Sequence, residues 1–297
     1  MLKIGIYGFG GVGCAIYHEL KDYKDLYILV DEDRKKRYES DGIIINDIKY
    51  NPNYITSGIM DIIIIALKNY QLKDSLEALK KFSNKYTVFL PMLNGITAHD
   101  VRKDYYPFNR VLYGVINVES NKIGNVCKTS KIINFQFGDE YNYVLRWPLR
   151  PLKKILDKYH MNNHIYHNMK RRVWDKWTLN LAINQVSALC NATYMDMSHP
   201  LVKEVLFNMV DEIYEVSMYY NIGLTPDDIL GLKNMINNFK SDRVTSLTVD
   251  FNKGGLNELS SFGETFLELA KKAQIETPVN KTVYNLLAGL DDNKKRK

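Results

Sequence analysis

Three polar residues recur at intervals of four in a stretch that is otherwise rich in Trp, Leu, Ala and Ile. They are Lys176, Asn180 and Asn184. In a helix this spacing puts the three side chains on one face. Burial against the flanking apolar residues lowers the pKa of a lysine and makes it a proton donor near neutral pH. The pattern favours a site with one acid and two amides over a solvent-facing polar stripe.

A second chemical signal is the glycine-rich segment near the N-terminus, which matches G-x-G-x-x-G. It consists of Gly8, Phe9, Gly10, Gly11, Val12 and Gly13. A strand-like stretch precedes it, and a helix and a second strand, Leu26–Val30, follow it. Gly8 permits a tight turn, Gly10 the approach of a pyrophosphate, and Gly13 close packing of helix on strand. The segment predicts a dinucleotide site, with an ordinary glycine turn as the alternative.

Asp31 directly follows the second strand, 23 residues beyond Gly8. At about this offset a carboxylate accepts hydrogen bonds from the adenosine ribose hydroxyls, which favours NADH. Four basic residues follow at once, Arg34, Lys35, Lys36 and Arg37. They could bind the 2′-phosphate of NADPH or form a solvated helix face. The predicted cofactor is therefore NADH or NADPH, with NADH slightly favoured by Asp31.

Two polar residues come directly after later strands. Lys68 follows the apolar run 61–67, and Asn94 follows the strand-like stretch 87–90. In an open parallel sheet, ligands bind at the carboxyl ends of the strands. Lys68 and Asn94 therefore stand where binding residues are expected, although a solvated lysine and an Asn-Gly turn explain them equally well.

The order of these elements predicts two domains. Strands and helices alternate in the first half, which includes a short helix and then a strand at 111–118. After Tyr166 only helical periodicity continues, to Leu290. We expect an α/β Rossmann-like domain with a parallel sheet at 1–166, an all-α domain at 167–290 and a charged, disordered tail at 291–297.

Composition narrows the class of protein. The chain has 297 residues, of which 45% are hydrophobic and 25% charged, as in folded globular proteins. The longest aliphatic run, Ile62–Leu67, is too short to span a bilayer, and no secretion signal is recognisable. The net charge of +6 comes from scattered residues. The three cysteines are too far apart for a Cys-x-x-Cys motif. We expect a cytoplasmic protein that binds no nucleic acid, membrane or metal.

Further polar residues downstream are ambiguous by pattern alone. Ser246 and Asp250 could cap a helix, and Glu258 could be an ordinary acid of a first helical turn.

Together these motifs resemble those of the ketopantoate reductase (2-dehydropantoate 2-reductase) family, over nearly the whole chain. The glycine segment is shared with many dehydrogenases, whereas the Lys-Asn-Asn helix with its downstream acid series is more specific. The motifs are Gly8–Gly13, Leu67–Gln71, Leu93–Gly95, Trp174 with Lys176, Asn180 and Asn184, Ser246 with Asp250 and Glu258, and Thr277–Asn280.

The resemblance implies a reduced nicotinamide cofactor that delivers hydride to the ketone of a 2-oxo acid, in a cleft between the two domains. The helical domain would be of the 6-phosphogluconate dehydrogenase C-terminal type. The product would be a D-2-hydroxy acid, and the reaction would be ketopantoate to pantoate in pantothenate biosynthesis. By resemblance Lys176 is the general acid, and Glu258 supports it or holds the substrate. Substrate-binding residues are Asn94, Asn180, Asn184 and Ser246; cofactor-binding residues are Gly8 to Gly13, Asp31, Lys68 and Asn94.

Three residues depart from the family pattern. Asp31 stands where NADP-dependent members carry a basic residue, Gln185 replaces a proline, and Glu264 falls where a glycine is usual. The alternatives are a reductase of another branched or aromatic 2-oxo acid, similar to D-mandelate dehydrogenase, and a dinucleotide sensor without catalysis. A homodimer is compatible with the resemblance.

Overall fold

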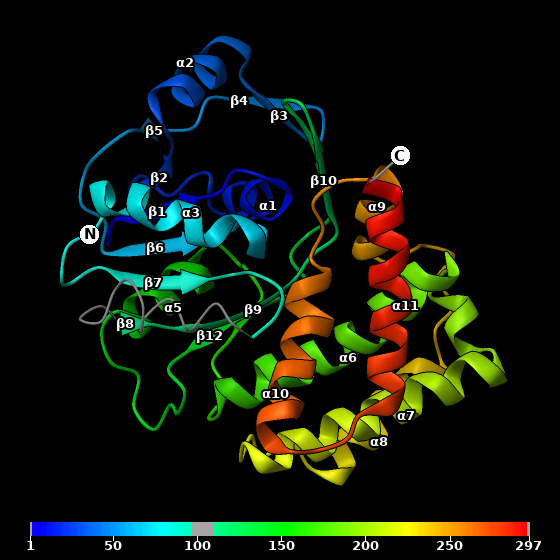
Figure 1. Ribbon diagram of the computed structural model, residues 1–297. Helices are drawn as coiled ribbons and strands as arrows, with labels where there is room; N and C mark the ends of the chain where they lie inside the picture. Colours follow the sequence, from blue (N-terminus) through cyan, green and yellow to red (C-terminus); the bar gives the residue numbers. More distant parts are fainter. Residues whose placement is uncertain (1, 97–109, 296–297) are drawn as a thin grey trace. The chain divides into compact units, whose positions relative to one another are not determined.

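The computed structural model describes residues 2–96 and 110–295 (Figure 1). The chain divides into two compact units, residues 1–172 and residues 173–297.

The first unit is built on a six-stranded parallel sheet with the strand order β5-β2-β1-β6-β7-β8. This arrangement confirms the predicted Rossmann-like fold. The strands are β1 (Ile4–Tyr7), β2 (Leu26–Leu29), β5 (Tyr54–Ile55), β6 (Ile62–Ile65), β7 (Val88–Pro91) and β8 (Arg110–Val111).

Strand β6 shows why this sheet is covered on both sides. Ile62 and Ile64 belong to the same core as the residues of helix α1, whereas Ile63 and Ile65 belong to the core that contains helix α3. Because successive side chains of a strand point to opposite faces, four isoleucines in a row require apolar layers on both. The helices of this unit are α1 (Gly11–Leu20), α2 (Glu32–Asp41), α3 (Asn69–Leu79), the 3-10 turn η1 (Lys80–Phe82) and α5 (Leu149–Lys158).

Two smaller sheets complete the first unit, in the orders β10-β11-β3-β4 and β13-β12-β9. The strand expected at 111–118 is in fact two strands, because the chain leaves the large sheet after β8 and β9 pairs with β12. The short helix expected before it lies outside the described residues. The strands are β3 (Ile43–Ile45), β4 (Ile48–Tyr50), β9 (Tyr113–Asn117), β10 (Ser120–Ile123), β11 (Val126–Thr129), β12 (Asn134–Gly138) and β13 (Asn163–His164).

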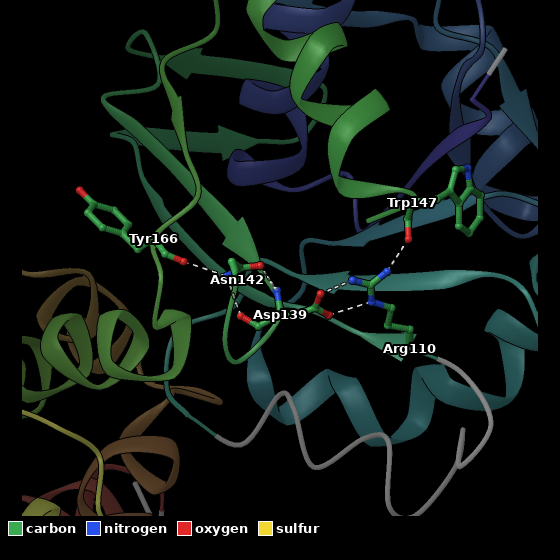
Figure 2. Close-up of polar contacts among 5 residues, drawn as sticks. All are labelled: Arg110, Asp139, Asn142, Trp147 and Tyr166. Carbon is green, nitrogen blue, oxygen red and sulfur yellow. Dashed lines mark hydrogen bonds and ion pairs between the residues drawn. The ribbon is translucent and has the colours of Figure 1, made fainter. Parts of the chain in front are cut away.

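A polar cluster ties the end of β12 to the segments around it (Figure 2). The Arg110 guanidinium of β8 donates to both carboxylate oxygens of Asp139 and to the Trp147 carbonyl. The Asn142 amide donates to the carbonyls of Asp139 and Tyr166, at 3.0 and 2.8 Å. The cluster thus fixes the chain that leads into the next helix, α6 (Met169–Cys190).

The second unit is helical, as predicted. Its elements after α6 are the 3-10 turn η3 (Met195–Ser198), α7 (Pro200–Tyr219), α8 (Pro226–Asn237), α9 (Ser246–Lys253), the π-helical turn η4 (Ser260–Glu264), α10 (Thr265–Ala273) and α11 (Pro278–Lys295). No helix in the described part of the chain is long and apolar enough to cross a membrane.

The C-terminal segment differs from the expected disordered tail, because α11 continues to Lys295. Two contacts hold its last turns. Asp291 is buried and accepts a 2.8 Å hydrogen bond from the Asn257 amide. The Lys294 ammonium lies 3.7 Å from the centroid of the Phe251 ring. These tertiary contacts order a sequence whose charge alone suggested disorder.

Candidate active site

The glycine segment forms the turn between β1 and α1. Gly8 has a φ of +97°, and a Cβ atom there would lie 2.5 Å from the Ala66 carbonyl oxygen. A Cβ atom on Gly13 would lie 2.1 Å from the Gly8 carbonyl oxygen. Packing therefore requires glycine at both positions.

Gly10, the residue that precedes α1, is different. A Cβ atom there would meet nothing within 4 Å, so the backbone faces open space at the start of the helix. The first N–H groups of a helix have no partner within the helix and attract anions. This open start of α1 fits the diphosphate of a dinucleotide.

Asp31 is the N-cap of α2. Its carboxylate accepts a 2.7 Å hydrogen bond from the Arg34 backbone N–H and forms an ion pair with the Arg34 side chain at 3.5 Å. Both side chains are more than half exposed. In the rest of the basic run, Lys35 pairs with Glu39 at 4.0 Å, and the Arg37 guanidinium lies 5.3 Å from the Tyr38 ring centroid. The exposed start of α2 therefore carries a carboxylate and a guanidinium side by side.

Lys68 and Asn94 lie beyond the carboxyl ends of neighbouring parallel strands, as expected. Ile65 of β6 is opposite Pro91 of β7, which brings the following loops to one edge of the sheet. The Asn69 side chain donates to the Asn94 carbonyl and so joins the two loops. Asn69 belongs to the Leu67–Gln71 motif, but the sequence does not predict that its side chain joins the two loops.

In the second unit, Lys176, Asn180 and Asn184 all lie on α6 at the predicted spacing. Lys176 and Asn180 are partly buried, and Asn184 is almost fully buried. Desolvation lowers the pKa of Lys176 to about 8, and the negative charge of Glu258 acts in the opposite direction. Glu258 is itself only 3% exposed. The fold therefore brings a buried carboxylate, distant in sequence, close to the lysine.

The segment after Glu258 is a π-helical turn, η4. The Trp177 indole donates to the Ser261 carbonyl at 3.2 Å, and the Ser261 N–H donates to the Glu258 carbonyl at 3.0 Å. Trp177 is the neighbour of Lys176 on α6, so this helix contacts the turn that follows Glu258. Single π-helical turns are frequent at functional sites. Nothing in the sequence pattern predicted this turn.

Of the family departures, Glu264 is the last residue of η4, and Gln185 lies beside that turn. Gln185 is fully buried, and its side-chain oxygen would lie 2.5 Å from a Cβ atom on Gly263. Packing thus requires glycine at 263, one residue before the exposed Glu264.

Ser246 begins α9 and is exposed. The helix cap is Thr245, whose hydroxyl accepts a hydrogen bond from the Thr248 N–H at 3.3 Å. The alternative in which Ser246 caps this helix is therefore wrong, and its hydroxyl is available to a ligand. Ser246, Lys176 and Glu258 belong to the second unit, whereas the glycine turn, Asp31, Lys68 and Asn94 belong to the first.

Comparison with known proteins decides the family. The family model described as ketopantoate reductase PanE/ApbA matches residues 4–139, and its C-terminal counterpart matches residues 168–291. The chain belongs to the ketopantoate reductase family. It is accordingly an oxidoreductase that uses a nicotinamide cofactor and acts on a 2-oxo acid.

Two relatives of this chain carry different descriptions, one general and one specific. "Uncharacterized oxidoreductase YkpB" of Bacillus subtilis is 24% identical over 95% of this chain and 97% of its own length. The 2-dehydropantoate 2-reductase of Streptococcus pyogenes is 25% identical over 70% of this chain and 73% of its own length.

Solved structures share the fold. A dimeric ketopantoate reductase from Staphylococcus aureus superposes with a TM-score of 0.84 at 18% identity and covers 99% of this chain and 100% of its own. D-mandelate dehydrogenase in complex with NADH and anilino(oxo)acetate gives a TM-score of 0.86 at 17% identity, with 99% of both chains covered.

Proposed function

We propose that this enzyme reduces ketopantoate to pantoate, with Lys176 as the general acid. One observation carries the proposal: a lysine on α6 whose pKa is lowered to about 8 by desolvation, with the Glu258 carboxylate close enough to influence it. Near neutral pH such a lysine is protonated and can still release its proton readily.

The residues of the first unit fit a nicotinamide dinucleotide. The open backbone at Gly10 and the start of α1 receive the diphosphate, Asp31 accepts hydrogen bonds from the adenosine ribose, and Lys68 and Asn94 hold the ligand at the strand ends. The bound cofactor supplies the hydride. Because a 2′-phosphate beside Asp31 is repelled, we expect NADH to be preferred over NADPH.

The residues of the second unit act on the 2-oxo acid. The Lys176 ammonium stabilises the negative charge that develops on the ketone oxygen and gives it a proton. Glu258 keeps the lysine charged and oriented. Asn180 and Asn184, one turn apart on α6, present two amides to the substrate carboxylate and hydroxyl, and Ser246 supplies a hydroxyl from α9.

A second candidate is a reductase of another branched or aromatic 2-oxo acid. It is favoured by the likeness in fold to D-mandelate dehydrogenase and by Gln185, which replaces the usual proline one residue after Asn184. We also propose a cytoplasmic enzyme that forms a homodimer, as its Staphylococcus aureus counterpart does.

Substrate competition distinguishes the two candidates. The purified chain is given NADH or NADPH with ketopantoate, with its deoxy analogue 3-methyl-2-oxobutanoate, or with phenylglyoxylate. We expect the highest kcat/KM for ketopantoate, because a site built around a hydroxyl is left with unpaired polar groups by the analogue. Equal rates on ketopantoate and its analogue, or faster turnover of phenylglyoxylate, would move the second candidate ahead.

A further inference from the structure

The β10-β11 hairpin covers the glycine turn from a distant part of the chain. Ser120 and Lys122 alternate with exposed residues on β10 and therefore share its inner face. The Ser120 hydroxyl lies 2.8 Å from the place of a Cβ atom on Gly11. The Lys122 ammonium donates a 2.6 Å hydrogen bond to the Phe9 carbonyl. Both residues thus face the glycine turn, which is expected to bind the dinucleotide.

The Lys122 ammonium contacts a carbonyl oxygen and two aromatic rings. Its ammonium lies 5.2 Å from the Phe9 ring centroid and 4.8 Å from that of Tyr38, and the side chain is partly buried. A carbonyl oxygen and aromatic faces attract a cation without carrying a negative charge. Across residues 2–96 and 110–295, Lys122 forms no ion pair, whereas Lys128 on the adjacent strand pairs with Asp47.

Two thiols, those of Cys14 and Cys127, lie near the Lys122 ammonium. The pKa of Cys127 is lowered to about 6, chiefly by the adjacent Cys14 thiol, with Ser120 and Lys122 acting in the same direction. Cys14 in turn donates to the Phe9 carbonyl at 3.7 Å. The Phe9 peptide is therefore held from two sides, by α1 through Cys14 and by β10 through Lys122.

We propose that Lys122 is a cofactor-positioning residue: it holds the Phe9 peptide of the glycine turn and places a positive charge beside the diphosphate of the nicotinamide dinucleotide. This inference rests on the proposed function. An ammonium has three N–H donors, of which the Phe9 carbonyl takes one. Its charge adds to the partial positive charge at the start of α1, so the two attract the same anion.

Calorimetric titration of NADH into the cofactor-free protein tests the inference without turnover. Lys122→Met removes both the charge and the hydrogen bond, and Lys122→Gln removes the charge but keeps an N–H donor. We expect the Met variant to bind about tenfold to a hundredfold more weakly, the scale of a lost charge-assisted hydrogen bond, and the Gln variant to bind at least about fivefold more weakly. Both should show a weaker dependence of affinity on salt than the parent. Lys128→Met is the matched control and should bind as the parent does.

The inference is wrong if the Gln variant, with an unchanged melting temperature, binds NADH as tightly as the parent and with the same salt dependence. If the Met variant does not fold, the NADH affinity of the Gln variant is sufficient to test the inference. Failure of the proposed function has a different signature: the parent protein itself would then bind neither NADH nor NADPH, or would bind NADH without reducing ketopantoate.

Discussion

Lys176 combines two properties that oppose each other: it is buried enough to lose affinity for its proton, yet it lies close to a carboxylate that favours the charged form. Desolvation is the larger effect, so the pKa falls below its ordinary value. A residue with this balance is suited to donate a proton near neutral pH, which neither a fully solvated lysine nor a tightly paired one does well.

Replacement of Lys176 tests its role directly. We expect Lys176→Ala to lower kcat for 2-oxo acid reduction by about two orders of magnitude or more, the usual scale for a positioned general acid. The Kd for the dinucleotide, measured by titration, should barely change. Lys170→Ala, on the same helix, is the control. Turnover near the parent rate would make Lys176 an ordinary helix lysine.

The pH profile tests the pair of Lys176 and Glu258. The general acid must be protonated, so kcat/KM for reduction should fall as the pH rises through about 8. Glu258 raises the pKa of Lys176, so Glu258→Gln should lower that pKa and move the falling limb to lower pH. Glu268→Gln, a change of an exposed acid on α10, should leave the limb in place. If the falling limb does not move in Glu258→Gln, Glu258 does not control the pKa of the general acid.

Ser246 is the residue on which substrate choice depends in the proposal. Ser246 is exposed at the start of α9, and Thr245 rather than Ser246 caps this helix. We expect Ser246→Ala to erase much of the preference for ketopantoate over 3-methyl-2-oxobutanoate, by lowering kcat/KM for ketopantoate about tenfold or more. An unchanged ratio of the two kcat/KM values would exclude Ser246 from the binding of that hydroxyl.

At the scale of elements, different glycines of the turn between β1 and α1 serve packing and ligand binding. Gly10→Ala adds a methyl group that meets no atom of the described residues within 4 Å other than its chain neighbours, whereas Gly13→Ala puts one 2.1 Å from the Gly8 carbonyl oxygen. We expect Gly10→Ala to keep the melting temperature and lose dinucleotide affinity about tenfold or more. Gly13→Ala should lower the free energy of unfolding by about 1–3 kcal/mol. Calorimetric titration and thermal unfolding of both variants check this; dinucleotide binding unaffected by Gly10→Ala would refute it.

The π-helical turn η4 accepts a hydrogen bond from a side chain of α6. Trp177→Phe removes the indole N–H and leaves the buried Ser261 carbonyl without that donor, which costs about 1–3 kcal/mol. Trp174→Phe is the matched control, because the contacts of the Trp174 ring are with the rings of Trp177 and Tyr220. In urea unfolding followed by circular dichroism, we expect Trp177→Phe to be the less stable variant. Equal stabilities would mean that this hydrogen bond does not hold η4.

Some elements could be predicted from sequence because local chemistry dictates them. A G-x-G-x-x-G turn needs glycine at fixed positions, and an all-isoleucine strand such as β6 must be buried on both faces. The β10-β11 hairpin could not be predicted in this way. Its strand Ser120–Ile123 has little hydrophobic alternation, and its contact with Phe9 spans 113 residues.

At the scale of the whole molecule, the two-part fold followed from the change in periodicity after Tyr166, and the family relationship agrees with it. The pairing of Lys176 with Glu258 could be stated only through the resemblance, since 82 residues separate them and helical spacing says nothing about such contacts. The ordered C-terminus was missed for the same reason: Asp291 and Lys294 are held by α9 and by the segment that follows it.

We propose above all that this chain couples oxidation of a reduced nicotinamide to reduction of a 2-oxo acid through Lys176. The most direct measurement follows the absorbance of NADH with ketopantoate and quantifies pantoate by mass spectrometry, for the parent and for Lys176→Ala. We expect one pantoate per NADH consumed in the parent, and almost none in a Lys176→Ala variant that still binds NADH. Consumption of NADH without pantoate, or equal yields from both proteins, would contradict the account.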